Sequence, residues 1–191
     1  MSFWTNHEKE GQMRARVMIA VGAAVAVSLV SAGWGAISAT AARGPNSFEG
    51  TCRLSGEFVF DQPLGNGLRT TTFTDTASGT CSGTLNGVAG ENIPVVNNVS
   101  GSGTLSCIAG ETTSDDTLTF EHHYPIRIFT TAVGGLTQFV AHTTGAVSGE
   151  SVEEVNVLPY FDQSTMEACQ AGTLTSARYD LIAYTITPLV G

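Results

Sequence analysis

The stretch "SGTCSGTLNG", residues 78–87, alternates two kinds of side chain. Cys81 and Leu85 stand among three glycines at the odd-numbered positions, and the even-numbered positions hold only serine, threonine and asparagine. Successive side chains of a strand point to opposite faces, so a period of two is typical of a strand with one face toward the core. The stretch therefore predicts a strand whose inner face carries cysteine, leucine and glycine.

The same alternation recurs in three other segments: "CRLSGEFVF" at 52–60, "GSGTLSC" at 101–107 and "TGAVSGES" at 144–151. Threonine, valine and phenylalanine favour further strands at 68–75, 93–99, 117–124, 126–131, 136–143, 152–158 and 173–187. Glycine-rich and asparagine-rich turn sequences separate them. Asp162 is expected to cap one short helical turn that places Glu167 near Cys169. The pattern predicts an all-β domain, either a single antiparallel β-barrel or a β-sandwich.

Glycines recur on the predicted inner face, at Gly56, Gly79, Gly101 and Gly103 among others. Glycine inside a strand lowers stability and marks a bend, a bulge or a close approach. The inner glycines therefore indicate strands that coil tightly or leave room for side chains opposite. A small closed barrel and a twisted sandwich both fit this pattern.

Four cysteines, Cys52, Cys81, Cys107 and Cys169, are expected to form two disulfides. An even number of cysteines in an exported chain is typical of disulfide pairing. Zinc is the alternative, but the sequence has no C-x-x-C pair and no cysteine–histidine cluster. Three connectivities are possible. We favour Cys52–Cys81 with Cys107–Cys169, because these pairs close two separate loops in sequence order.

The N-terminal segment has the features of a secretory signal peptide, which we assign to residues 1–41. Arg14 and Arg16 precede a long apolar run, and "ATA" at 39–41 fits a cleavage site before Ala42. Met13 is a possible true start. The alternative is an uncleaved membrane anchor, since the apolar run is about long enough to span a bilayer. We therefore expect an extracellular, secreted β domain over residues 42–191.

The chain is acidic, with a formal net charge of −9. The part after residue 41 has no lysine and keeps five arginines against fifteen carboxylates. A surface of this sign repels phosphate backbones and anionic headgroups. We expect no nucleic-acid partner, and membrane contact only through the N-terminal segment if it stays uncleaved.

Sequence motifs for the common catalytic sites are absent. The chain has no G-x-S-x-G, G-x-G-x-x-G or H-E-x-x-H sequence, and the missing lysine excludes Schiff-base chemistry after residue 41. Asp115 and Asp116 are expected in a solvated turn. We therefore expect no cofactor and no metal.

The candidates for chemistry come from "TLTFEHHYPIRIF" at 117–129 and from the last predicted strand. If Leu118 and Phe120 face inward, strict alternation also turns two further side chains inward, His122 and Tyr124. One register of the last strand adds three more to the interior: Arg178, Asp180 and Tyr184. A histidine there could act as an acid or a base. In the alternative, one bulge turns Arg178 and Asp180 outward and places three others inside, Tyr179, Leu181 and Ala183.

Three segments, "FEGTCRLSG" from residue 48, "GTCSGTLNG" and "GTLSC", resemble a group of secreted proteins of high-GC Gram-positive (actinobacterial) bacteria with no assigned activity. The resemblance covers residues 48–190 and implies bacterial origin, export, disulfides and a β domain. Small barrel enzymes of the allene-oxide-cyclase or dirigent type are a looser architectural analogy, from which no catalytic residue is transferred.

The sequence favours a non-catalytic secreted domain that binds a small apolar or amphipathic ligand inside, or a cell-envelope or protein partner outside. A cofactor-free isomerase, cyclase or hydrolase using His122 with Asp180 or Tyr124 is the first alternative. The second is an adhesion or carbohydrate-binding module, for which Tyr160 and Phe161 are the adjacent aromatic pair.

Overall fold

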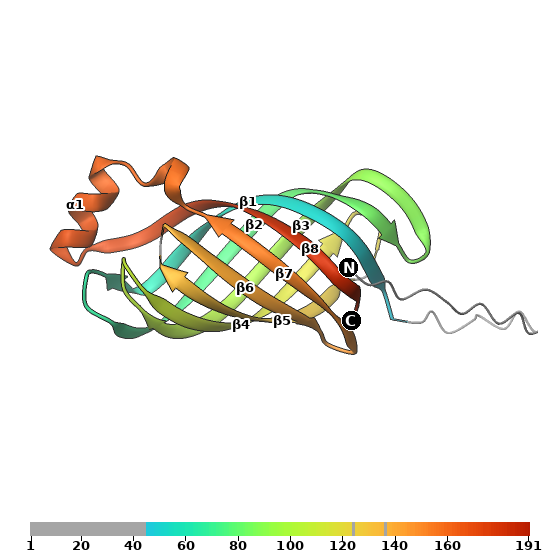
Figure 1. Cartoon of the computed structure of the whole chain (residues 1–191), viewed down its shortest axis with the longest axis horizontal. Coiled ribbons are helices and arrows are strands. Elements are labelled where there is room, and N and C mark those ends of the chain that lie inside the picture. The colour runs from blue at the N-terminus through green and yellow to red at the C-terminus, as the bar shows by residue number, and fades with distance from the viewer. Residues whose placement is uncertain (1–44, 124, 136) are drawn as a thin grey trace, which may run out of the picture. The chain divides into compact units, whose positions relative to one another are not determined.

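The computed structural model describes residues 45–123, 125–135 and 137–191, with Leu158 described by its backbone alone. The predicted signal peptide and Tyr124 lie outside the described residues. Eight antiparallel strands close into a barrel in which each strand pairs with the next and β8 pairs with β1 (Figure 1). The strands are β1 (Ser47–Leu64), β2 (Arg69–Leu85), β3 (Val88–Leu105), β4 (Gly110–Phe120), β5 (Ile126–Gly135), β6 (Gln138–Gly145), β7 (Ser148–Asn156) and β8 (Leu174–Val190).

Strand β2 contains the stretch at 78–87 up to Leu85 and confirms its predicted orientation. Cys81 and Leu85 are buried, and the serines and threonines between them are less so. The inner glycines make room for side chains opposite: a Cβ built on Gly101 would lie 2.4 Å from the ring of Phe73. The prediction of an all-β domain is thereby confirmed, and of its two architectures the closed barrel is the one formed.

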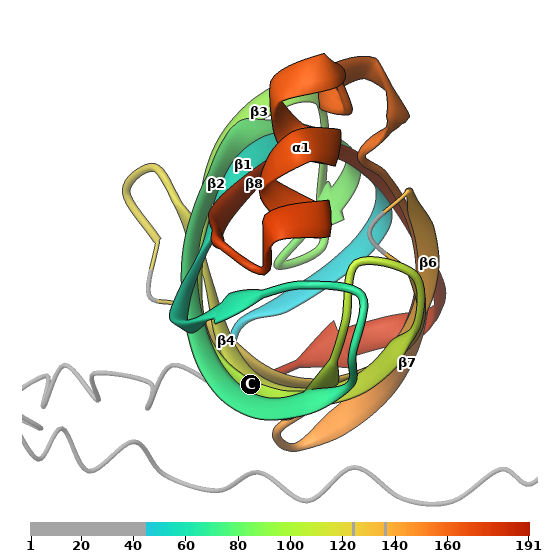
Figure 2. The ribbon, with the colours of Figure 1, turned by 90° about the vertical axis from the view of Figure 1, so that its left-hand side faces the viewer.

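The two ends of the barrel differ in their connections. At the helix end lie the β1–β2, β3–β4 and β5–β6 turns, together with a 3₁₀ turn, η1 (Leu158–Tyr160), and the helix α1 (Gln163–Ala171). Figure 2 shows α1 across one part of this end. The first and last strand residues and the other three turns lie at the opposite end, called here the terminal end.

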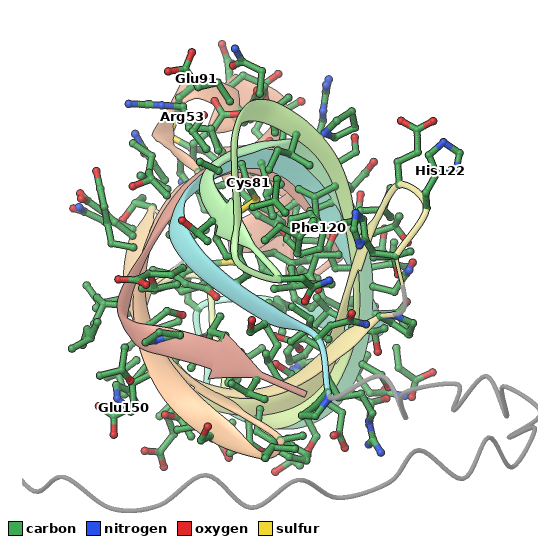
Figure 3. The ribbon with its side chains drawn as sticks, turned by 90° about the vertical axis from the view of Figure 1, so that its right-hand side faces the viewer. Arg53, Cys81, Glu91, Phe120, His122 and Glu150 are labelled. Carbon is green, nitrogen blue, oxygen red and sulfur yellow. A yellow bond between two sulfur atoms is a disulfide. The ribbon has the colours of Figure 1, made fainter. Side chains whose placement is uncertain are left out.

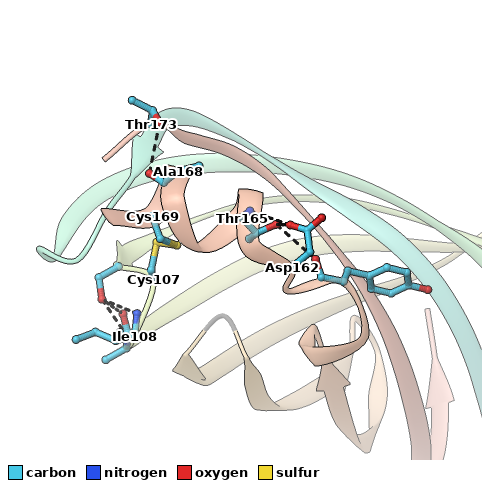
Figure 4. Close-up of a disulfide and its surroundings, with 10 residues drawn as sticks. Cys107, Ile108, Asp162, Thr165, Ala168, Cys169 and Thr173 are labelled. Atoms are coloured by element: carbon cyan, nitrogen blue, oxygen red, sulfur yellow. Dashed lines mark hydrogen bonds between the residues drawn. A yellow bond between two sulfur atoms is a disulfide. The ribbon is translucent and has the colours of Figure 1, made fainter. Parts of the chain in front are cut away.

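The short helix α1 begins and ends at recognisable capping residues. Asp162 accepts a hydrogen bond from the Thr165 amide at 2.9 Å, and Gly172 ends the helix with a φ of 70° (Figure 4). The helical turn expected after Asp162 is confirmed. None of the described helices is long and apolar enough to span a bilayer.

Both favoured disulfides are confirmed. Cys52–Cys81 links β1 to β2 inside the barrel, and Cys107–Cys169 links the β3–β4 turn to α1 (Figure 4). Two disulfides are typical of a protein from an oxidising environment. The second bridge fixes α1 beside the β1–β2 turn as well, because the Cys107 amide donates to the Gly65 carbonyl oxygen at 2.8 Å.

Two strand predictions extended too far. Strand β4 ends at Phe120, so His122 lies in the β4–β5 turn. Val147, which the alternation at 144–151 places on the inner face with Gly145 and Gly149, is 65% exposed in the turn between β6 and β7. In both places a tight turn interrupts the alternation of inward and outward side chains. The prediction assumed that the strand continues, whereas the chain reverses direction there.

Candidate functional site

A cavity of about 80 Å³ lies inside the barrel toward the helix end. At ~10–15 Å³ for each water, this volume has room for about five to eight water molecules. Its outer part is bordered by turn and strand-end residues of the helix end: Leu105, Ser106, Gly110, Gly134 and Gly135. Its wall is largely apolar, with Phe58, Phe60, Phe73, Val99, Ala132, Phe139 and Ala141, and it also includes Thr112 and Ser114 of β4. At its inner end lie four polar residues: Asn97, Asp116, Thr130 and Glu153.

These polar residues occupy inward positions of β3, β4, β5 and β7. Asp116 shares the face of Leu118 and Phe120, so the inward register predicted for those two already includes it. Asp116 is only 4% exposed, and its expected place in a solvated turn is therefore wrong. Glu153 follows the parity of Val155, which is also buried. Strand parity was the signal available for both carboxyl groups.

The polar inner end is organised as one continuous chain of contacts. The Thr130 hydroxyl donates to Asp116 Oδ2 at 2.6 Å. Thr130 Oγ1 lies 2.9 Å from Thr143 Oγ1, and Thr143 Oγ1 lies 2.9 Å from Glu153 Oε1. All four side chains are buried. The chain joins two carboxyl groups from β4 and β7 through two threonines of β5 and β6, and we call it the carboxyl relay.

The carboxyl relay needs one protonated carboxyl group. Three oxygen–oxygen hydrogen bonds require three protons, and the two threonine hydroxyls supply two. The third proton must come from Asp116 or Glu153. The pair therefore carries one negative charge instead of two.

The surroundings of both carboxyl groups favour protonation. Burial raises the pKa of Glu153 to about 7; the nearby Asp116 adds to this shift and the hydrogen bond with Thr143 opposes it. Burial also raises the pKa of Asp116, against the hydrogen bonds from Thr130 and Ser114. Taking a carboxylate out of water disfavours its charged form, which is the common cause.

A third inner carboxyl group, Asp75 of β2, forms a pair with Tyr179 of β8. The Tyr179 hydroxyl donates a hydrogen bond to Asp75 Oδ2, and the Glu57 amide donates to Asp75 Oδ1 at 3.0 Å. Gly56 leaves the space for the pair, since a Cβ there would lie 2.8 Å from both Asp75 Oδ1 and the Tyr179 ring. The Phe58 ring stacks on Tyr179 at 4.4 Å between centroids. Burial raises the pKa of Asp75 and of Tyr179.

Two acceptor atoms of this interior have no partner. Asn97 Oδ1 and Asp116 Oδ1 are the buried side-chain oxygen or nitrogen atoms without a hydrogen bond within the described residues. The four arginines that the structure describes are all exposed: Arg53, Arg69, Arg127 and Arg178. The described residues also include no group of three or more histidines, cysteines, aspartates and glutamates suited to a metal ion. The interior thus presents acceptors and negative charge without a protein cation.

Beyond Asn97 and Glu153 a second hollow of about 20 Å³ continues toward the terminal end. It has room for about one or two waters. Its other lining is largely apolar and includes Phe48, Leu118, Ile128 and Leu189. The polar residues therefore form a layer across the barrel between an open hollow and an apolar base.

The predicted inward register of His122, Arg178, Asp180 and Tyr184 is wrong. His122 has a positive φ of 62° and an 87% exposed side chain 3.3 Å from Glu121 (Figure 3). Arg178 is exposed and Tyr184 is 49% exposed. The structure does not bring these residues together: His122 lies at the terminal end, whereas Asp180 pairs with Asn156 near the helix end.

The bulge alternative for the last strand is confirmed. Tyr179 and Leu181 are buried and Ala183 is partly buried, while Asp180 lies on the outer face, where it accepts hydrogen bonds from Ser55 and Tyr160. The shift occurs near the start of β8, where Leu174 pairs with Leu64 but Ser176 pairs with Val59. The irregularity changes the parity between Leu174 and Ala177, both of which are buried.

The aromatic pair considered for adhesion forms no exposed platform. The Arg178 guanidinium lies 5.0 Å from the centre of the Tyr160 ring, and the Tyr160 hydroxyl donates to Asp180. Phe161 packs against the hydrophobic core. Both rings therefore contribute to fixing the segment before α1 on β8.

No protein-family model, curated protein or solved structure was found to match the chain.

Proposed function

We propose that the barrel is a secreted binding domain for a slim amphipathic small molecule, which enters at the helix end. One observation carries the proposal: the cavity has an apolar wall and a polar inner end with two unpartnered buried acceptors. Leaving buried polar atoms without partners is unfavourable, so a ligand that supplies donors removes a cost already present in the free protein. Apolar walls with a few converging polar groups are typical of small-molecule sites.

The disulfides support the extracellular part of the proposal. Cys52–Cys81 and Cys107–Cys169 are stable in an oxidising compartment and are rare in the cytosol. The Cys107–Cys169 bridge also keeps α1 and the β3–β4 turn in place beside the opening of the cavity. A binding domain that works outside the cell benefits from an entrance of fixed shape.

The binding proposal is tested with the full chain and 1-octanol as a neutral amphipathic probe, by isothermal titration calorimetry. We expect saturable binding, and a loss of at least ten-fold in affinity for Ala132→Leu, which places a larger side chain in the cavity wall. Thr131→Leu, at the neighbouring exposed position, is the matched control and keeps the wild-type affinity. Equal affinities for the two variants would contradict binding inside the barrel. Native mass spectrometry of the wild-type protein provides a second measurement if Ala132→Leu does not fold.

The carboxyl relay supports a second candidate function, cofactor-free acid–base catalysis. It places an ionised and a protonated carboxyl group in one hydrogen-bonded chain beside the cavity. Such a pair can take a proton from a bound substrate and return it elsewhere, as in an isomerisation. An enzyme of this kind would exchange an activated carbon-bound hydrogen of its ligand, such as one beside a carbonyl group, for deuterium in D₂O, and Asp116→Asn would abolish the exchange. A ligand that binds and gains no deuterium would contradict catalysis and leave the binding proposal in place.

A further inference from the structure

The unpartnered acceptors define what a ligand must bring to the inner end of the cavity. Asn97 of β3 and Asp116 of β4 are each 4% exposed, and both line the cavity. Asn97 pairs with Leu118, two residues after Asp116, so the two acceptors are diagonal neighbours on adjacent strands. A ligand group that lies between them has to donate two hydrogen bonds to leave neither acceptor unpaired.

The charges around Asp116 all have the same sign. The titratable side chains that face the interior are Asp75 from β2, Asp116 from β4, Glu153 from β7 and Tyr179 from β8. Strands β1, β3, β5 and β6 bring no titratable side chain inward within the described residues, apart from the disulfide-bonded Cys52. The described arginines and histidines are exposed. A cation in this cavity would meet carboxyl groups and no competing protein cation.

The lengths of the hydrogen bonds locate the single charge of the carboxyl relay. The Thr130–Asp116 distance of 2.6 Å falls in the range of about 2.5–2.7 Å for hydroxyl-to-carboxylate bonds. The Thr143–Glu153 distance of 2.9 Å is the longer one, as for a neutral pair. The shorter bond favours Asp116 as the ionised member, and the burial that raises the pKa of Glu153 to about 7 favours Glu153 as the protonated one. The free Oδ1 of Asp116 belongs to the charged carboxylate.

We propose that the inner end of the cavity binds the ammonium group of a primary amine with a slim apolar tail. The inference rests on the proposed binding function and names its ligand class. An ammonium group has three donors and no acceptor, whereas a hydroxyl has one donor and a carboxylate none. It therefore fits two acceptors and one negative charge in a poorly solvated site. The tail lies along the apolar wall toward the helix end, where Phe58 and Phe139 provide contacts.

The test compares three probes that share one tail. The full chain is titrated calorimetrically at pH 7.5 with n-octylamine, which is an ammonium ion at this pH, and with 1-octanol and octanoate. We expect the octylammonium ion to bind at least ten-fold more tightly than 1-octanol, and octanoate more weakly than both. Equal affinity for octylammonium and 1-octanol would overturn the amine inference.

A pair of charge-neutralising variants separates the site from the general acidity of the protein. Asp116→Asn removes the inner charge, and we expect it to lower octylammonium affinity at least ten-fold and 1-octanol affinity by a much smaller factor. Asp115→Asn removes a neighbouring exposed charge, which pairs with Arg127 outside, and is expected to change neither. If both variants lower octylammonium affinity equally, the effect is long-range attraction by the surface and the inference is wrong.

A pH series on the wild-type protein tests the inference without any variant. Lowering the pH from 7.5 toward 4 protonates Glu153, whose pKa is about 7, as well as Asp116, so octylammonium affinity should fall steeply while 1-octanol affinity changes much less. An octylammonium affinity independent of pH would contradict the role of Asp116.

If neither 1-octanol nor octylammonium binds, the proposed binding function itself fails. If 1-octanol binds and octylammonium gains nothing, the function stands and only the amine inference is lost.

Discussion

The terminal and helix halves of the barrel interior differ in the polarity and packing of their side chains. The terminal half is filled by large apolar side chains that are almost fully buried, and the Phe48 and Phe120 rings lie 5.2 Å apart. Figure 3 shows Phe120 and Cys81 inside the barrel. The helix half contains the cavity, the carboxyl relay and the Asp75–Tyr179 pair. Apolar burial supplies most of the stability of a small domain. We therefore infer that the apolar terminal half provides most of the stability of the whole barrel, including the helix half.

This division explains why buried carboxyl groups are tolerated in so small a barrel. Each of them opposes folding when charged, because burial removes its hydration. Closure of the sheet pairs all strands and leaves no free edge, and apolar side chains of β1, β2, β4, β5 and β8 pack on the terminal side of the polar layer. The predictions below measure how unequal the two halves are.

The largest effect is expected from truncating a side chain of the terminal half. Phe120→Ala removes a 1% exposed ring from a packed region and should lower the free energy of unfolding by about 3–5 kcal/mol. Phe139→Ala removes a partly buried ring beside the existing cavity, so the loss should be about half as large. Denaturant unfolding under oxidising conditions measures both. Equal losses would show that the two halves contribute alike.

The next effect concerns Glu153 and depends on pH. A carboxyl group whose pKa rises from 4.5 in the unfolded chain to about 7 in the fold stabilises the protein fully below pH 4.5. That contribution, about 3 kcal/mol, is lost as the pH rises through 7. Glu153→Gln stays neutral at every pH, and its amide supplies the third proton of the carboxyl relay. We therefore expect this variant to equal the wild type near pH 4.5 and to be more stable at pH 8.

Unfolding curves at a series of pH values test the prediction for Glu153. Glu154→Gln is the matched control, because Glu154 is the neighbouring exposed residue and accepts a hydrogen bond from Gln138 on the outer surface. It should keep the wild-type pH dependence. A Glu153→Gln variant that is less stable than the wild type at pH 8 would contradict the protonated relay.

A smaller loss is expected from filling the space left by Gly56. In Gly56→Ala the new Cβ would lie 2.8 Å from Asp75 Oδ1 and from the Tyr179 ring, so the pair has to shift, at a cost of about 1–3 kcal/mol. Gly67→Ala is the control, because a Cβ there has no neighbour within 4 Å. The ratio of the two unfolding free energies measures how tightly the Asp75–Tyr179 pair is packed. Equal stability of the two variants would show that the pair adjusts freely.

Much of the fold could be predicted from the sequence, because alternation is a local signal. Cys52, Cys81, Leu118 and Phe120 all lie on the predicted inner face. Barrel closure could not be predicted, since it depends on the pairing of β1 with β8 over more than a hundred residues. The register of β8 stayed open between two alternatives for a related reason: the irregularity that decides it involves the partner strand, between Val59 and Leu64, and leaves no mark in the sequence of β8 itself.

The candidate site was missed although its signal was present. Asp116 shares the parity of Leu118, and Glu153 that of Val155, so the same rule that placed the apolar residues inward also places the acids there. The inward parity was instead extended past Phe120, where β4 ends, so that His122 of the following turn was taken as an inner residue. What no local pattern supplies is the contact between acids of different strands, which only the closed barrel creates.

The smallest effect is expected at Asp162, outside the barrel. Asp162→Ala removes the acceptor for the Thr165 amide and should lower Tm by about 2–4 °C. The loss stays local because the Cys107–Cys169 bridge still holds the end of α1. Asp162→Asn keeps an acceptor and should match the wild type at neutral pH. Hydrogen bonds from Thr165 and Ser164 lower the pKa of Asp162, so its contribution is present above pH 3.8 and is lost on further acidification, opposite in sign to Glu153. Hydrogen exchange should show faster exchange in α1 alone; faster exchange in β4 and β5 would mean that the helix supports the barrel.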